Sequence, residues 1–265
     1  MTPLLQTKDL CVGYGDRAVV QDVSVVFPAG CVTAVVGPNG SGKSTLLRAM
    51  CRLLPVRRGV VEVAGREVSG FGAREFARMV ALLPQHPVAP EGISVRELVA
   101  RGRYPHQGFL HSPSAEDREV VQWALEATSV AGFADRMCSS LSGGQRQRVW
   151  MAMVLAQRTP IVCLDEPTTY LDMAHQIELL DLVRDLARER QLTVVAVLHE
   201  LNLAARCAEQ VVTIKDGRVA ACGAPAEVFT PGLCREIFDL DAVVIDDPAV
   251  GHPLVAGRGR LVEGV

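Results

Sequence analysis

The fold of this chain is decided by the stretch Gly37-Pro38-Asn39-Gly40-Ser41-Gly42-Lys43-Ser44-Thr45. An apolar run rich in β-branched residues, Val32 to Val36, precedes it, and Leu46-Leu47-Arg48-Ala49-Met50 follows it. A strand, a glycine-rich loop and a helix in this order are the context that a Walker A phosphate loop requires. The backbone N–H groups of the loop and the start of the helix point into one small volume, which favours phosphate oxygens. The stretch therefore predicts an α/β fold that binds a nucleotide through its phosphates.

Three side chains at the end of this loop are expected to contact the phosphates or their metal ion. Lys43 is placed to reach the β- and γ-phosphates as a point charge, and the Thr45 hydroxyl lies beside them. The Ser44 hydroxyl is placed to ligate Mg²⁺. A simple glycine-rich turn before a helix is the alternative, but it leaves the Gly-Lys-Ser ending to chance. We therefore expect residues 37–45 to form the nucleotide-binding loop.

An acidic pair follows a second apolar run, Ile161-Val162-Cys163-Leu164. The run predicts a buried parallel strand that ends in Asp165-Glu166-Pro167. Carboxylates at the carboxyl end of a central strand lie where α/β sheets bind ligands. Asp165 is placed to hold Mg²⁺, directly or through water, and Glu166 to accept a proton from an attacking water. A solvated acidic turn is the alternative, and the phosphate loop in the same chain makes it the poorer explanation.

A second anion-binding helix start is predicted at Leu141-Ser142-Gly143-Gly144-Gln145. The apolar residues between Arg146 and Gln157 have an approximately helical spacing, and Ser142 occupies the capping position. Helix capping alone does not require two glycines and a glutamine. Here the sequence resembles the ATP-binding cassette (ABC) family, whose signature motif is LSGGQ. The resemblance covers nearly the whole chain, and it implies that ATP is contacted by Ser142, Gly143, Gly144 and Gln145.

The resemblance implies roles for residues outside these motifs. Tyr14 matches the aromatic residue that stacks on adenine. Gln85 matches the glutamine that contacts the metal ion and the nucleophilic water and senses the membrane partner. His199, which follows the apolar run 193–197, matches the histidine that contacts the γ-phosphate, and Leu171-Asp172 matches the loop that crosses to the other subunit. Without the family match, an exposed tyrosine and a lone histidine after a strand would both be interpreted as structural.

The number of motifs makes a prediction about assembly. The chain contains a single phosphate loop and a single signature motif. In the ABC family the signature motif closes over ATP bound to the opposite subunit, so one chain supplies half of each site. Two copies arranged head to tail about a two-fold axis would complete two equivalent sites. Hydrolysis to ADP then removes the γ-phosphate contacts that favour closure, so we expect an ATP-dependent homodimer.

Composition limits the classes of protein to which this chain can belong. Its 265 residues have a net charge of −3, so it lacks the global basic character of nucleic-acid-binding proteins. Hydrophobic residues make up 49%, yet no run approaches the ~18 apolar residues of a membrane-spanning helix. The N-terminus is too short and polar for a signal peptide. The eight cysteines are scattered without a CxxC pair, which indicates core thiols in a reducing, cytoplasmic compartment.

The resemblance implies a P-loop NTPase with a RecA-like core, an antiparallel β subdomain and an inserted α-helical subdomain. Short β-like runs alternate with turns from Leu4 to Val36, and Asp216-Gly217 is a type I′ hairpin signal. Further strands are expected at 60–63, 78–83, 193–197, 210–215 and 218–221. Helices are expected at 95–101, 114–128, 142–158 and 172–190.

These elements suggest one main domain. We assign residues 1–245 to a single ABC ATPase domain, with the helical subdomain inserted at about residues 87–158. The residues after Pro248 are rich in Gly and Pro. We therefore expect residues 246–265 to form an extended C-terminal tail.

The helical subdomain contains the segment with which the ABC family docks on membrane subunits. This segment reads Glu97-Leu98-Val99-Ala100-Arg101-Gly102-Arg103-Tyr104-Pro105-His106-Gln107. By charge alone it would be a solvated basic loop, but Arg-Gly-Arg-Tyr-Pro-His is similar to the ATP-binding subunits of ferric-siderophore importers. Residues 145–157, 165–172 and 244–248 are similar to the same subunits. The resemblance implies an ATPase on the cytoplasmic face of the inner membrane, bound to integral membrane permease subunits that a substrate-binding protein supplies with an iron chelate.

Three alternatives remain open from the sequence. The same machine could carry haem or cobalamin, since those importers share the ATPase motifs and the ATPase does not touch the cargo. The second alternative is a soluble, non-transport ABC ATPase that acts on ribosomes or on iron–sulfur assembly. The ribosomal class, however, usually has two cassettes in one chain. A regulatory module that binds ATP without hydrolysing it is the least favoured, because Gln85, Glu166 and His199 are intact.

Overall fold

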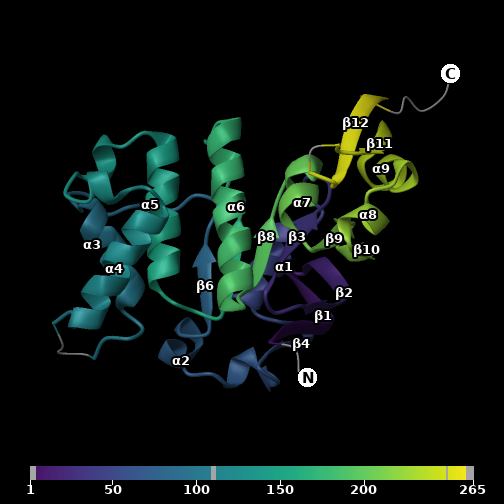
Figure 1. The fold of residues 1–265 in the computed structure, drawn as a ribbon. Helices are drawn as coiled ribbons and strands as arrows, with labels where there is room; N and C mark the ends of the chain where they lie inside the picture. Colours follow the sequence, from purple (N-terminus) through teal and green to yellow (C-terminus); the bar gives the residue numbers. More distant parts are fainter. Residues whose placement is uncertain (1–3, 109–111, 249, 261–265) are drawn as a thin grey trace.

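The computed structural model describes residues 4–108, 112–248 and 250–260 (Figure 1). A central sheet has the strand order β10-β9-β3-β8-β7-β6. Its strands are β3 (Cys31–Val36), β6 (Val80–Leu83), β7 (Ile161–Asp165), β8 (Thr193–Val197), β9 (Gln210–Lys215) and β10 (Arg218–Gly223). The pairs β3–β8, β3–β9, β6–β7 and β7–β8 are parallel, whereas β10 runs antiparallel to β9. The predicted α/β class is confirmed.

The parallel strands are continuous apolar runs because both of their faces are covered. Every residue of β7 and of β8 is buried. The register pairs Asp165 with Val197 and Val35 with Val197, so the carboxyl ends of β3, β7 and β8 lie at one edge of the sheet. The loops that follow these strands therefore meet at that edge, where open α/β sheets bind ligands.

A second, antiparallel sheet has the order β2-β1-β4-β5. Its strands are β1 (Leu5–Tyr14), β2 (Arg17–Phe27), β4 (Arg58–Val63) and β5 (Arg66–Glu67). Along β2, Val23, Val25 and Phe27 are buried and alternate with exposed residues, as the period of two predicts. These side chains join one apolar core with Leu46 of helix α1 (Lys43–Met50) and with Val195 of β8. Helix α1 is thereby held between the two sheets.

The helices between β6 and β7 form a separate lobe, drawn in teal at the left of Figure 1. They are α3 (Val95–Ala100), α4 (Ala115–Ala127) and α5 (Gly143–Ala156). Each begins after a serine whose hydroxyl accepts a hydrogen bond from the backbone N–H three residues later: Ser94, Ser114 and Ser142. These helices agree with the predicted ones to within two residues at each end.

Shorter elements complete the description of the fold. A short helix, α2 (Ala73–Ala77), and the 3₁₀ turn η1 (Val68–Gly70) lie before β6, and the turns η2 (Arg101–Arg103), η3 (Ala131–Phe133) and η4 (Cys138–Ser140) lie in the lobe. Helix α6 (Met173–Arg190) packs against strands β3 and β8 of the central sheet. In the described residues, no helix is long and apolar enough to span a bilayer.

The predicted hairpin at Asp216-Gly217 is confirmed. Both residues have positive φ angles, 49° and 76°, as a type I′ turn requires. The turn reaches the phosphate loop, where the Gly217 N–H donates to the Ser41 carbonyl oxygen at 3.0 Å. The turn of the β9–β10 hairpin is therefore hydrogen-bonded to the phosphate loop.

The predicted extended tail is wrong in the part that the structure describes. After α7 (Leu201–Cys207), α8 (Pro225–Val228) and α9 (Pro231–Phe238), the strands β11 (Leu240–Asp246) and β12 (Pro253–Arg260) form an antiparallel hairpin. Asn202 of α7 anchors it, because its side chain accepts from the Val255 N–H at 2.8 Å and donates to the Val255 carbonyl at 3.2 Å. The expected boundary at residue 245 therefore falls inside a strand. Residues 249 and 261–265 of the expected tail lie outside the described residues, and the division into one domain with an inserted subdomain stays a prediction.

Candidate nucleotide-binding site

The phosphate loop connects β3 to α1 at the ligand-binding edge of the sheet. Gly37 and Gly42 have φ angles of 152° and 108°, which favour glycine, and a Cβ atom on Gly37 would collide with the Ile214 carbonyl oxygen. The Lys43 ammonium donates hydrogen bonds to the carbonyl oxygens of Gly37 at 2.8 Å and Pro38 at 2.9 Å. The lysine is thus folded over its own loop, at the start of a helix whose free N–H groups attract anions. Burial lowers the pKa of Lys43, against the raising effect of Glu166 and Asp165.

Asp165 and Ser44 form the part of the site that suits a metal ion. Asp165 is the last residue of β7 and is 2% exposed, and the Ser44 hydroxyl donates to its Oδ1 atom at 2.8 Å. Burial raises the pKa of Asp165, although the Ser44 hydrogen bond and the Arg48 charge oppose this rise. A hydroxyl and a carboxylate are oxygen ligands of the kind that Mg²⁺ prefers together with phosphate and water. In the described ranges there is no group of three or more His, Cys, Asp or Glu residues that could hold a metal ion.

Glu166 and His199 face each other across the ends of β7 and β8. Glu166 has a φ angle of 54°, in the left-handed region that non-glycine residues adopt rarely. Its Oε1 atom lies 2.5 Å from the His199 Nε2 atom. Burial raises the pKa of Glu166, but hydrogen bonds from His199 and Gln85 and the charge of Lys43 outweigh it and lower the pKa overall. The carboxylate is therefore held ionised, as an acceptor of protons must be.

These groups line one pocket of about 240 Å³. In the part of the chain that the structure describes, its walls are Val19, Asn39, Gly40, Gly42, Lys43, Ser44, Thr45, Glu166 and His199. The phosphate loop, the carboxylate strand and the histidine after β8 were predicted from separate motifs, and the fold brings them together. Asp165 joins the pocket through Ser44, and Gln85 joins it through Glu166. The arrangement can hold polyphosphate, a divalent cation and an attacking water in one place.

Tyr14 lies at the end of β1 and is 46% exposed. Its hydroxyl is 3.4 Å from the Nη1 atom of Arg48. Arg48 also acts electrostatically on Asp165, so it contributes to the site although the sequence analysis missed it. The sequence did contain a signal for Arg48. Residues four apart lie on the same face of a helix, and Arg48 is four residues after Ser44. Val19 also lines the pocket, and nothing in the sequence indicated this.

The signature segment does not line this pocket. Ser142 caps α5, and its hydroxyl accepts from the Gln145 N–H at 3.2 Å. A Cβ atom on Gly144 would lie 3.1 Å from the Leu171 side chain, so the signature packs against the Leu171-Asp172 loop. The Gln147 side chain donates to the Pro167 carbonyl at 2.8 Å and ties α5 to the loop that follows Glu166. Within one chain, the two predicted anion-binding helix starts belong to different surfaces.

Comparison with known proteins agrees with this geometry. The family model described as ABC transporter matches residues 20–169. The chain is 49% identical to the protein named "Probable siderophore transport system ATP-binding protein YusV" of Bacillus subtilis (strain 168), over 97% of this chain and 94% of that protein.

Solved structures are similar over most of their length. A metal-chelate type ABC transporter in an inward-facing conformation superposes with a TM-score of 0.83 and 27% identity, covering 97% of this chain and 98% of the other. The dimeric structure of the bacterial ABC transporter cassette MJ0796 gives a TM-score of 0.75 at 27% identity, covering 83% and 98%. The chain belongs to the ABC transporter family, in which it is an ATP-binding subunit with ATPase chemistry.

Proposed function

We propose that this chain is the ATPase that powers uptake of a ferric siderophore or related iron chelate. It works on the cytoplasmic face of the membrane, bound to integral membrane permease subunits that receive the chelate from a substrate-binding protein. Two findings support this assignment: the similarity to YusV along almost the whole chain, and the superposition on a metal-chelate type transporter. The observation that carries the ATPase part is the pocket that joins the phosphate loop to the Glu166–His199 pair.

The residues of the pocket divide the chemistry among them. Residues 37–45 bind the phosphates, and Tyr14 stacks on the adenine ring. Ser44, Asp165 and Gln85 would hold Mg²⁺, which supplies positive charge against the phosphoryl group. Glu166 takes the proton of the water that attacks the γ-phosphorus. Lys43 and His199 stabilise the charge that develops on the phosphoryl oxygens.

A second copy completes each site. Ser142, Gly143, Gly144 and Gln145 of one protomer cap the γ-phosphate held by the phosphate loop of its partner. The position of the signature segment outside the pocket of its own chain supports this arrangement. The dimeric MJ0796 cassette is a precedent for two such chains in one assembly. Loss of the γ-phosphate on hydrolysis weakens the closed dimer, and the permease subunits respond.

Substitution of Glu166 tests the ATPase mechanism. Glu166→Gln keeps the shape of the side chain and removes the base, so ATP binding is retained and the ATP-bound dimer accumulates. Light scattering with ATP and Mg²⁺ should report a dimer for this variant, while phosphate release falls by at least about 10²-fold. Lys43→Ala should weaken ATP binding itself. Ordinary turnover by Glu166→Gln would remove the proposed base from the mechanism.

The cargo is tested by transport. Cells with and without this chain are given ferric siderophore, haem or cobalamin, each isotopically labelled. Uptake of the ferric siderophore that depends on the chain and on Glu166 supports the proposal. Uptake of haem or cobalamin instead would establish the alternative cargo, and failure to co-purify with membrane subunits would favour a non-transport ATPase.

A further inference from the structure

A second pocket, of about 480 Å³, lies where the helical lobe meets the core of the chain. Its lining residues come from α4 and α5 of the lobe, from the start of β7, and from the end of α6. The nucleotide pocket is at the carboxyl ends of β7 and β8, whereas this pocket is at their amino ends. Among the described residues, none lines both pockets. The volume falls in the range of pockets that hold small molecules, so we ask which ligand this one suits.

The floor of this second pocket is aliphatic. It is formed by buried and half-buried side chains: Val154, Leu155, Pro160, Val162, Leu186 and Leu192. The Thr159 hydroxyl also lies at the pocket, but it donates to the Ile161 carbonyl oxygen at 2.8 Å and is therefore already engaged. Burial of apolar surface is favourable and needs no particular geometry. The floor therefore suits the hydrocarbon part of a ligand.

The charged side chains at this pocket are both arginines. Among the described residues that line it, Arg158 and Arg190 are charged and none is acidic. Both arginines are exposed, so their guanidinium groups lie at the rim rather than on the floor. The Cζ atom of Arg190 is 4.1 Å from the centre of the Trp123 ring, a cation–π contact that joins the end of α6 to α4. This contact uses the face of the guanidinium group and leaves the N–H donors at its edge for a ligand.

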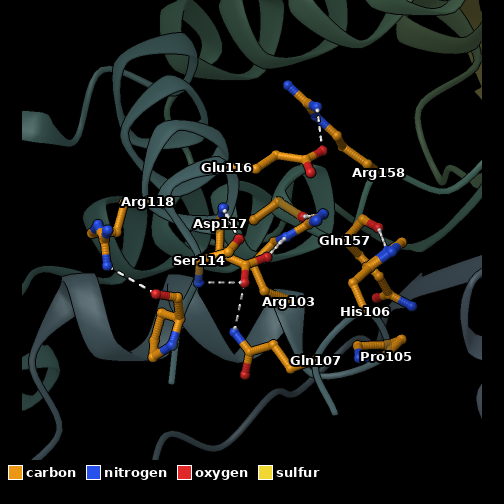
Figure 2. A network of polar contacts seen from close by, with 12 residues as sticks. Arg103, Pro105, His106, Gln107, Ser114, Glu116, Asp117, Arg118, Gln157 and Arg158 are labelled. Atoms are coloured by element: carbon orange, nitrogen blue, oxygen red, sulfur yellow. Dashed lines mark hydrogen bonds and ion pairs between the residues drawn. The ribbon is translucent and has the colours of Figure 1, made fainter. Parts of the chain in front are cut away.

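Arg158 has a carboxylate partner, but a weak one. Its Nη1 atom lies 3.7 Å from the Oε1 atom of Glu116, and the two side chains are 41% and 71% exposed (Figure 2). An exposed ion pair at this distance contributes little to stability, so a bound carboxylate can compete for Arg158 at small cost. In the part of the chain that the structure describes, Arg190 forms no ion pair at all. Guanidinium groups recognise carboxylates through paired N–H donors, so the rim is complementary to an anion.

We propose that this pocket binds a medium-chain aliphatic carboxylate, with the hydrocarbon chain on the floor and the carboxylate on Arg190 and Arg158. An aliphatic body fits better than an aromatic one. Trp123 is the one aromatic residue among the described lining residues, and Arg190 already covers a face of its ring. The inference is independent of the proposed function, because the residues that carry it lie outside the nucleotide pocket.

The test measures the binding of radiolabelled decanoate to the full chain by equilibrium dialysis, below the concentration at which the acid forms micelles. Decanol has the same chain without the charge, and acetate has the charge without the chain. We expect decanoate to bind at least about tenfold more tightly than decanol, because hydrogen bonds to charged groups are stronger than neutral ones. Acetate should not bind measurably, since it lacks the hydrocarbon that the floor buries.

Tryptophan fluorescence locates the bound acid. The chain contains two tryptophans, so in a Trp150→Phe protein the tryptophan emission comes from Trp123 alone. Trp123 lines the pocket, and a ligand beside it should alter its emission. The change should saturate with the dissociation constant that dialysis gives for decanoate.

Three variants separate the rim from the floor. Arg190→Gln removes a rim charge and keeps a good helix former, so the affinity for decanoate should fall about tenfold while that for decanol is unchanged. Arg158→Asn should act in the same way. Asparagine tolerates the left-handed conformation of Arg158, whose φ angle is 50°, so the loop should persist. Leu192→Phe places a larger side chain on the floor and should weaken the binding of both ligands.

Arg188→Gln is the matched control. It removes the same charge from the same helix, but Arg188 pairs with Glu209 at 2.8 Å and does not line the pocket. Its affinity for decanoate should equal that of the natural protein. The midpoint of thermal unfolding is measured for every variant, so that a loss of binding is compared at equal stability.

The proposal is supported if decanoate affinity falls in Arg190→Gln and Arg158→Asn at an unchanged unfolding midpoint, while Arg188→Gln binds normally. Decanol that binds as tightly as decanoate would remove the anion from the proposal. Normal decanoate binding by Arg190→Gln and Arg158→Asn, or a Trp123 emission that does not respond to saturating decanoate, would overturn the site. Iron-chelate transport is not part of these measurements, so failure of the proposed function would leave their results unchanged.

Discussion

The Nε2 atom of His199 lies 2.5 Å from the Oε1 atom of Glu166 because their strands are aligned at the sheet edge. Strands β7 and β8 are adjacent and parallel, and their register places Asp165 opposite Val197. Glu166 is one residue after Asp165 and His199 is two residues after Val197, so both lie just beyond the ends of their strands. The Glu166 N–H also donates to the Val197 carbonyl oxygen at 3.2 Å, which fixes the backbone of the pair.

This contact predicts a change in the pH dependence of hydrolysis. The pKa of Glu166 is lowered because the hydrogen bonds from His199 and Gln85 and the charge of Lys43 exceed the raising effect of burial. His199→Ala removes one of these contacts, so the pKa rises and the carboxylate becomes protonated at a higher pH. The acid limb of the kcat profile should therefore move to higher pH, and kcat should fall by about 10² or more.

The control for this prediction is His199→Gln, which keeps an N–H donor toward Glu166. Its acid limb should lie between those of the natural protein and His199→Ala. The measurement is steady-state phosphate release at saturating ATP over a series of buffers. An acid limb that stays in place in His199→Ala would show that His199 does not set the ionisation of Glu166.

Asp165→Asn tests the metal part of the site. Asparagine retains an oxygen that can accept from Ser44, so the local structure persists, but the negative charge is lost. The Mg²⁺ concentration for half-maximal ATPase activity should rise by about 10- to 100-fold, as for other residues that hold or orient a metal. Asp216→Asn is the control, because asparagine suits a type I′ turn and Asp216 lies outside the pocket. Equal Mg²⁺ requirements in both variants would contradict the role of Asp165.

Ser142→Asp tests whether the signature acts on the partner's nucleotide. Aspartate caps a helix as well as serine, so α5 should keep its N-terminus. Its negative charge would face the partner's γ-phosphate in the proposed dimer and repel it. In a Glu166→Gln background, ATP should therefore produce dimers without this substitution and monomers with it.

Thr230→Asp is the matched control for that experiment. Thr230 is an exposed N-cap of α9 whose hydroxyl accepts from the Leu233 N–H, so the same change there preserves a cap far from the nucleotide. Its dimer fraction should equal that of Glu166→Gln alone. A normal dimer in the Ser142→Asp variant would rule out the head-to-tail arrangement.

The predictable parts of the fold and the site are those whose signals are local. The phosphate loop, the strand that ends in Asp165 and the capping residue Ser142 each combine a short motif with the period of one element, and the structure contains them where expected. The proximity of Glu166 and His199 depends on the order of the strands in the sheet. No local motif gives that order, and the family resemblance supplied it. The roles assigned to these residues remain predictions.

The parts that the sequence did not reveal depend on contacts between distant residues. The basic segment around Arg103 looked like a solvated loop by charge, yet Arg103 is buried because Asp117 and the Ala156 carbonyl offer it partners. The C-terminal strand contains Gly257 and Gly259, which weaken any strand signal. Its pairing with β11 and its anchor on Asn202 are visible only in three dimensions.

Asn202→Ala tests whether the side chain of Asn202 on α7 stabilises the β11–β12 hairpin. The substitution leaves the N–H and carbonyl groups of Val255 without their side-chain partner, at a local cost of about 1 kcal/mol for each hydrogen bond. Hydrogen exchange at Val255 should therefore quicken by about tenfold, which corresponds to ~1.4 kcal/mol of protection. ATPase activity should stay unchanged, since Asn202 does not line the nucleotide pocket. Gln122→Ala on α4 is the control, and slow exchange at Val255 in both variants would mean that β11 holds β12 without help from α7.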